Sequence, residues 1–166
     1  VGHRTGVDMS VRDRALALFT GKTVGIVGLG REGLALAEFF CSLGVPIVAT
    51  DDKPLAALRP EMGLLDGKGA TVLTGGMNEA VLEADCCFVS PGVPLDLPLI
   101  VRAREKKVPL WNEPGLLLAL CPSTTVGVTG SSGKSTTSAL LASMLEASGT
   151  RVFLGGNIGV PLLPRV

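Results

Sequence analysis

Short apolar runs alternate with helical patterns along most of this chain, and this alternation restricts the possible folds more than any other feature. The runs lie at 23–27, 46–50, 70–73, 86–89 and 108–111, and their apolar and β-branched residues predict buried strands. Strands that alternate with helices are typical of a parallel sheet with helices on both faces. We therefore predict an α/β fold with a doubly wound parallel sheet.

Helical spacing of apolar residues is clearest after the first strand. Leu36, Phe39, Phe40 and Leu43 fall on one face of a helix, and Gly44 follows where a C-terminal cap belongs. Further helical segments are predicted near 54–60, 77–83, 97–107 and 113–120. These elements fill residues 1–121, which we expect to form one complete Rossmann-like domain.

A second unit is predicted after a linker at 121–123. A strand at 124–128, a glycine loop, a helix at 134–148 and a strand at 151–154 follow in that order. We interpret residues 122–166 as the beginning of a P-loop-type α/β ATPase domain. Two strands and one helix cannot bury both faces of a sheet, so we expect this domain to be truncated.

Composition narrows the function classes. Fifteen Lys and Arg residues balance 15 Asp and Glu residues, which argues against nucleic acid or an acidic membrane as the main partner. The single histidine, His3, excludes a histidine cluster within this chain. The four cysteines lack zinc-site spacing, no apolar run approaches the ~18 residues of a membrane span, and the N-terminus does not resemble a secretory signal. We therefore expect a cytoplasmic protein.

A G-x-G-x-x-G motif occupies Gly28–Gly33, between the first strand and the next helix. Its glycines permit a tight turn and close backbone approach to a diphosphate, and the helix N-terminus supplies amide donors. Asp51 ends the second strand, where a carboxylate can accept hydrogen bonds from a ribose or a base. The alternative is a glycine turn that only packs the helix on the strand.

A second phosphate-binding pattern occupies Thr129–Thr136, with the sequence T-G-S-S-G-K-S-T. Its glycines expose amides to phosphate oxygens, Lys134 is placed to reach terminal phosphates, and the Ser135 hydroxyl is placed to bind Mg²⁺. Val128 stands where a strict Walker A motif has glycine. The alternative, a lysine that merely begins a helix, would put a cation at the unfavourable end of the helix dipole.

Three turns follow strands at the edge where doubly wound sheets bind ligands. They are Ser90–Pro91–Gly92, Asn112–Glu113 and, in the second unit, Gly155–Gly159. Ordinary turn chemistry also explains each of them.

Together these motifs resemble the Mur ligases of peptidoglycan synthesis. The resemblance runs from about Lys22 to the last residue and depends on GIVGLGREG, DDK, SPGV, NEPGLLL, VTGSSGKSTT and GGNIGVP. It implies three domains: a Rossmann-like domain for the UDP part of the substrate, a central ATPase domain and a C-terminal domain for the amino acid. It also implies ATP-dependent amide formation through an acyl phosphate. The GNIG and GLG segments favour the member that adds D-glutamate to UDP-N-acetylmuramoyl-L-alanine.

The resemblance assigns roles to two sets of residues. ATP would be held by Gly130, Ser131, Ser132, Gly133, Lys134, Ser135 and Thr136, with Lys134 catalytic and Ser135 on Mg²⁺. The UDP part would be held by Gly30, Arg31, Glu32, Asp51, Asp52, Gly92 and Asn157. Two positions depart from the family pattern. Ser132 stands where Asn is common, and Glu32 places a carboxylate beside a diphosphate, which is repulsive unless it turns away or pairs with Arg31.

Three other readings remain open on the residues alone. A nicotinamide-dependent dehydrogenase explains the first loop and Asp51 but leaves the second phosphate loop without a role. A nucleotide-sensing module would bind ATP and form no amide product. Another ligase of the superfamily, such as the L-alanine-adding enzyme, would share both loops. The resemblance further implies a monomer at full length and no turnover by these 166 residues alone.

Overall fold

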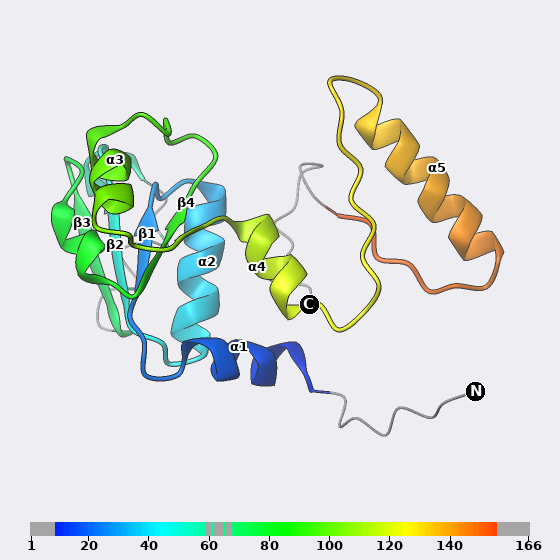
Figure 1. The fold of residues 1–166 in the computed structure, drawn as a ribbon, viewed down its shortest axis with the longest axis horizontal. Helices are drawn as coiled ribbons and strands as arrows, with labels where there is room; N and C mark the ends of the chain where they lie inside the picture. Colours follow the sequence, from blue (N-terminus) through cyan, green and yellow to red (C-terminus); the bar gives the residue numbers. More distant parts are fainter. Residues whose placement is uncertain (1–8, 59–60, 62–64, 66–67, 156–166) are drawn as a thin grey trace.

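The computed structural model describes residues 9–58, 61, 65 and 68–155, and its centre is a five-stranded parallel sheet (Figure 1). The strand order is β3-β2-β1-β4-β5. The strands are β1 Val24–Val27, β2 Ile47–Asp51, β3 Ala70–Thr74, β4 Cys86–Val89 and β5 Leu110–Trp111. All four pairings are parallel, and Val24 lies opposite Ile47 on one side and Cys86 on the other. The predicted doubly wound sheet is confirmed, and its order reverses between β1 and β4.

Helices cover both faces of this sheet. They are α1 Val11–Phe19, α2 Arg31–Ser42, α3 Pro98–Glu105 and α4 Glu113–Leu120, with 3₁₀ turns η1 Leu55–Ala57 and η3 Glu79–Glu83. The helix α5 Lys134–Ala147 comes after them in the chain and does not belong to this covering. Apolar residues of α1, α2 and α4 share one buried cluster with the sheet, whereas η3 and α3 belong to the cluster on the other face. Figure 1 shows α3 and α2 on opposite sides of the sheet. The helix predicted near 77–83 is the short 3₁₀ turn η3, and the described part of the helix predicted near 54–60 contains the 3₁₀ turn η1; residues 59 and 60 lie outside the described residues.

The first helix, α1, was not predicted from the sequence. Ser10 caps it: the Ser10 hydroxyl accepts from the Asp13 N–H, and the Asp13 carboxylate accepts from the Ser10 N–H, which makes a capping box. The helix ends with Phe19, which is buried against Phe40 at a ring-centroid distance of 5.0 Å. Phe40 in turn lies 5.3 Å from Phe88 of β4. This aromatic contact fixes α1 and α2 on the same face of the sheet.

The part of the chain after α4 is built differently. The predicted helix at 134–148 is confirmed as α5, but it has a single buried residue, Ala142, and stands apart from the sheet in Figure 1. The strands predicted at 124–128 and 151–154 are wrong, since neither segment forms a strand. A strand needs a hydrogen-bonded neighbour, and within the described residues neither segment has one. No helix in the described part is long and apolar enough to span a membrane.

Candidate functional site

The G-x-G-x-x-G loop lies at the carboxyl end of β1, where the strand order reverses. Gly28 has a φ of +89°, a left-handed conformation that favours glycine. Its N–H donates to the Thr50 carbonyl oxygen at 2.9 Å. A Cβ on Gly33 would lie 2.1 Å from the Gly28 carbonyl oxygen, so α2 packs on the loop at a distance that only glycine permits. The first and third glycines of the motif therefore have steric roles.

Gly30 is the second glycine of the motif, and its surroundings are open. It is the N-cap of α2, it makes no side-chain capping bond, and a Cβ on it would meet no atom within 4 Å. Gly92 at the neighbouring strand end is equally open. The amides at the start of α2 therefore face space that an anionic ligand can occupy.

Asp51 ends β2 and is turned toward the protein backbone. It is 7% exposed. Its Oδ2 accepts from the Leu29 N–H at 2.6 Å, and its Oδ1 accepts from the Lys53 N–H at 2.9 Å. Both carboxylate oxygens thus bond to backbone in this structure, and the predicted contact of Asp51 with uridine remains a prediction. Asp52 is exposed at the same strand end, so its predicted contact with the base or ribose remains a prediction.

Ser90 joins the turn after β4 to the glycine loop. Its hydroxyl donates to the Gly28 carbonyl oxygen at 2.7 Å, and its N–H donates to the Val27 carbonyl oxygen at 2.9 Å. The turns at Gly28–Gly30 and Ser90–Gly92 therefore lie side by side at the point where strand order reverses, as the sequence predicted for this edge.

Charged side chains gather at the first turn of α2. Burial raises the pKa of Glu32, the negative charge of Glu113 raises it further, and the Arg31 guanidinium partly offsets both effects. Glu113 is the first residue of α4 and is 6% exposed. Sequence reasoning placed Asn112–Glu113 at this edge but missed that Glu113 interacts with Glu32. Asn112 caps α4 by accepting from the Gly115 N–H at 2.8 Å, so Glu113 begins this helix.

The second loop, at 129–136, is exposed. Gly133 is the N-cap of α5 with a φ of +76°, a left-handed conformation in which glycine is favoured. The Lys134 ammonium donates to the carbonyl oxygens of Gly130 and Ser131. These are atoms of its own loop, so the lysine lies folded over the turn that would receive phosphates. The side chains of Ser131, Ser132, Ser135 and Thr136 are exposed, whereas Asn157 lies outside the described residues.

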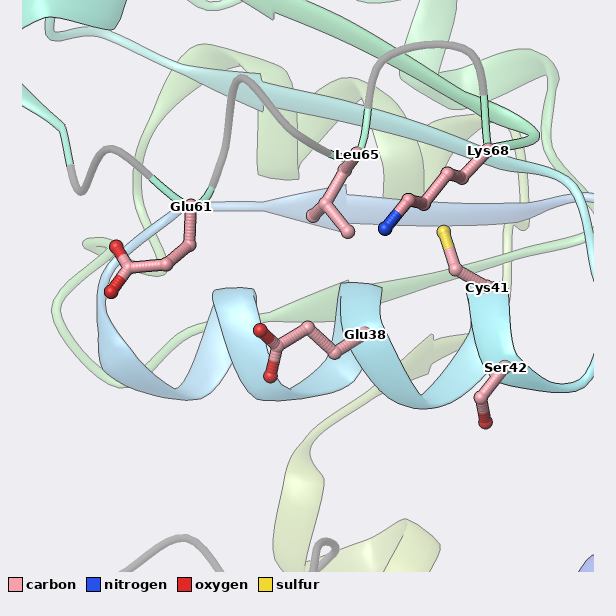
Figure 2. Close-up of a pocket in the computed structure, with 6 residues that line it drawn as sticks. All are labelled: Glu38, Cys41, Ser42, Glu61, Leu65 and Lys68. Carbon is pink, nitrogen blue, oxygen red and sulfur yellow. The ribbon is translucent and has the colours of Figure 1, made fainter.

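A separate cavity of about 340 Å³ lies along α2 (Figure 2). Its lining residues are Glu38, Cys41, Ser42, Glu61, Leu65 and Lys68. Glu38, Cys41 and Ser42 belong to the C-terminal half of α2, whereas the glycine loop meets the N-terminal end of that helix. The cavity is therefore not part of the candidate site. Among the described residues, no group of three His, Cys, Asp or Glu side chains could hold a metal ion.

Comparison with protein families gives one match to the first part of the chain. Residues 22–112 match the family described as Mur ligase MurD-like, N-terminal domain. This range contains the five strands, the first glycine loop, Asp51 and Ser90, but it ends before the second loop.

Relatives in which the match extends further are ligases. The chain is 40% identical to the UDP-N-acetylmuramoylalanine–D-glutamate ligase of Koribacter versatilis, over 86% of the chain and 32% of the relative. It is 41% identical to the ligase of the same name from Desulfosudis oleivorans, over 86% of the chain and 31% of the relative. The chain thus spans about a third of the length of these curated relatives.

Solved structures with the same fold include two ligases. The murein peptide ligase Mpl of Psychrobacter arcticus matches with a TM-score of 0.53 at 21% identity, covering 88% of this chain and 32% of that one. A UDP-N-acetylmuramate:L-alanyl-γ-D-glutamyl-meso-diaminopimelate ligase from Neisseria meningitides matches with a TM-score of 0.50 at 23% identity, covering 84% and 45%. At these identities the likeness concerns the fold alone.

Proposed function

The chain belongs to the MurD-like Mur ligase family, and on this premise we propose that its sheet domain binds the uridine diphosphate part of UDP-N-acetylmuramoyl-L-alanine. The observation that carries the proposal is the loop at Gly28–Gly30. It lies where strand order reverses, it opens onto the uncapped N-terminus of α2, and the open Gly92 follows the neighbouring strand. This geometry suits a diphosphate that bonds to backbone amides and needs few cationic side chains.

Within this proposal, different residues at the loop contact different parts of the ligand. Gly30 and Arg31 line the diphosphate, with Gly92 on the opposite side of the same pocket. Asp52 accepts hydrogen bonds from the uridine, and Glu32 lies near enough to lower affinity for a dianion while it is ionised. Asn157 is proposed to contact the substrate phosphates from the second unit.

We further propose that the loop at 130–136 binds ATP. The residues present fit such a ligand, because Gly133 leaves the first amides of α5 without a side-chain cap and Lys134 is the next residue. Lys134 would shift from its own loop carbonyls to the β- and γ-phosphates, and the Ser135 hydroxyl would hold Mg²⁺. When bound, Mg²⁺ neutralises charge that develops on the transferring phosphoryl group.

The proposed reaction of the enzyme that contains this chain has two steps. The carboxylate of UDP-N-acetylmuramoyl-L-alanine attacks the γ-phosphorus of ATP, which gives an acyl phosphate and ADP. The amine of D-glutamate then attacks the acyl carbon and expels phosphate, which leaves an amide. We propose a cytoplasmic, monomeric enzyme of peptidoglycan synthesis, in which residues 1–121 form the substrate domain and residues 122–166 begin the ATPase domain.

Calorimetric titration of the 166-residue chain with UDP and with NADH tests the first part of the proposal. We expect saturable UDP binding and no tight NADH binding. NADH binding without UDP binding would instead favour a nicotinamide-dependent protein. Adding a fluorescent ATP analogue separates the two loops, because a Lys134→Ala variant should lose the analogue and retain UDP.

A further inference from the structure

The cavity along α2 differs in charge from one end to the other. Glu38 and Cys41 are three residues apart on α2, so they share one face of that helix. Glu61 and Lys68 line the cavity from the chain between η1 and β3. Figure 2 shows the carboxylates of Glu38 and Glu61 toward one end of the cavity and the Lys68 ammonium toward the other. The Leu65 side chain points into the space between them.

The apolar middle of the cavity belongs to the core of the sheet domain. Leu65 is 5% exposed and is a member of the buried cluster that α1, α2 and α4 share with the sheet. The Lys68 N–H donates to the Leu65 carbonyl oxygen at 3.0 Å, and the Ile47 N–H of β2 donates to the Gly69 carbonyl oxygen at 2.9 Å. These bonds tie the basic end of the cavity to its apolar middle and to the sheet.

The charged side chains of the cavity are available to a ligand. Glu38, Glu61 and Lys68 are exposed, and within the described part of the chain none of the three forms an ion pair or a side-chain hydrogen bond. Burial raises the pKa of the Cys41 thiol, the Lys68 ammonium lowers it, and the Glu38 carboxylate raises it. Opposite charges therefore lie within electrostatic range of the same sulfur atom, a separation that one small molecule can span.

We propose that this cavity binds a small zwitterionic amino acid with an apolar side chain. The ammonium of the ligand bonds to the carboxylates at the acidic end, its carboxylate bonds to Lys68, and its side chain covers Leu65. A simple anion would meet two carboxylates, and a simple cation would meet the lysine, so neither satisfies both ends. The volume of about 340 Å³ suits a small ligand. The inference is independent of the proposed function, because the cavity lies away from both glycine loops.

Three probes of similar size test the two ends of the cavity separately. L-Leucine carries both charges, L-leucinamide lacks the carboxylate, and N-acetyl-L-leucine lacks the ammonium. Each is titrated into the ¹⁵N-labelled 166-residue chain and followed by NMR. We expect saturable binding of leucine that shifts the amides of Glu38, Cys41 and Lys68. Each of the other two probes should bind about fivefold more weakly, the size of one partly screened ion pair.

Substitutions at either end should act on matching probes. Lys68→Gln should lower leucine affinity about fivefold without weakening leucinamide, which has no carboxylate to lose a partner. A chain with both Glu38→Gln and Glu61→Gln should lose leucine affinity to a similar extent without weakening N-acetyl-leucine. The matched controls Lys107→Gln and Glu105→Gln remove exposed charges near the end of α3 and should change none of the affinities. Thermal unfolding first establishes that every variant folds.

Cys41 supplies a second readout, because its thiol lines the same cavity. Leucine should slow the alkylation of Cys41 by iodoacetamide in proportion to the occupied fraction of the chain, and should leave Cys121 unaffected. The proposal is overturned if leucine does not saturate below about 50 mM, or if either singly charged probe binds as tightly as leucine. Equal losses of leucine affinity in the control variants and the cavity variants would overturn it as well.

Discussion

The two glycine loops of this chain share a strand–loop–helix sequence pattern but differ in what holds them. In the loop at 28–30, Leu29 is 1% exposed and the backbone bonds to residues of β2 and of the turn after β4. In the loop at 130–133, the residues are exposed, and within the described part of the chain Lys134 bonds to carbonyls of its own turn. The first loop is held by hydrogen bonds to residues at the ends of neighbouring strands, whereas the described hydrogen bonds of Lys134 lie within its own turn.

This difference teaches how to interpret a glycine motif. Glycines predict what a backbone is able to do, namely to turn tightly and to approach a phosphate. The neighbouring strands decide whether that conformation is held in advance of the ligand. The pairing of β1 with β2 and β4 supplies this support to the first loop, whereas the segment at 124–128, which precedes the second loop, pairs with no described strand.

The largest expected effect is on stability, and it compares the packing of the sheet domain with that of α5. Phe40 is fully buried, and Phe40→Ala should lower the free energy of unfolding by about 3–5 kcal/mol, because it leaves a cavity in the aromatic cluster. Leu140 of α5 is 61% exposed, and Leu140→Ala should change the free energy of unfolding by less than about 0.5 kcal/mol. Urea unfolding followed by circular dichroism measures both. Equal losses would mean that α5 is packed as firmly as the sheet domain.

The next effect concerns the chemistry of the second loop. In an active ligase that carries this chain, Lys134→Ala should lower kcat by more than about a hundredfold, the size of one lost preorganised charge donor. Phosphate release with ATP, Mg²⁺, UDP-N-acetylmuramoyl-L-alanine and D-glutamate measures it. The matched control is Lys106→Ala, which removes an exposed ion pair between Lys106, the C-cap of α3, and Glu83 of η3. A decrease of less than tenfold would remove Lys134 from the proposed role.

Much of the sheet domain could be predicted because its signals are local. Strand 86–89 and helix 113–120 were predicted at the bounds that the structure gives, since one is a continuous apolar run and the other follows an Asn cap. The strands predicted at 124–128 and 151–154 failed because strand pairing is not local. Val126 is as apolar as any residue of β1, but it is 65% exposed and has no neighbouring strand among the residues that the structure describes.

The site could be predicted in position but not in the orientation of its side chains. The motif and the strand ends located Gly28–Gly33, Asp51 and Ser90 at one edge of the sheet. The sequence could not show that Asp51 turns toward Leu29, which lies 22 residues earlier in the chain. It also could not show that Glu113 comes close enough to Glu32 to affect its pKa, because that contact depends on how α4 packs beside α2.

Thiol chemistry offers a smaller test of the same regional difference. Burial raises the pKa of Cys86 to about 11 and that of Cys87 to about 12, from an ordinary value of 9.0. Both thiols therefore stabilise the fold fully below pH 9, and this contribution is lost as pH rises from 9 toward 12. At pH 8 we expect Ellman's reagent to modify Cys121, which is half-buried after α4, at least about tenfold faster than either.

A matched variant isolates this effect from the titration of lysines over the same pH range. In a chain with both Cys86→Ala and Cys87→Ala, the free energy of unfolding should fall less steeply above pH 9 than in the unmodified chain. Rapid modification of Cys86 or Cys87 at pH 8 would show that β4 opens as easily as the segment after α4.

The smallest expected effect concerns Glu32, which stands at the proposed diphosphate pocket. Burial and Glu113 raise its pKa, so the carboxylate gains a proton more readily than an ordinary glutamate as pH falls. UDP affinity should therefore increase as pH falls through this raised pKa, because the repulsion between the carboxylate and the diphosphate disappears. Glu32→Gln should bind UDP about threefold more tightly at pH 7.5, the size of one partly screened charge contact, and should lose this pH dependence.

Glu38→Gln, which removes a carboxylate on the same helix beside the separate cavity (Figure 2), should keep both the affinity and the pH profile of the unmodified chain. Equal affinities for the Glu32 and Glu38 variants would mean that the diphosphate does not lie at the first turn of α2, so the loop at 28–30 would be a structural turn and no longer the counterpart of the loop at 130–133.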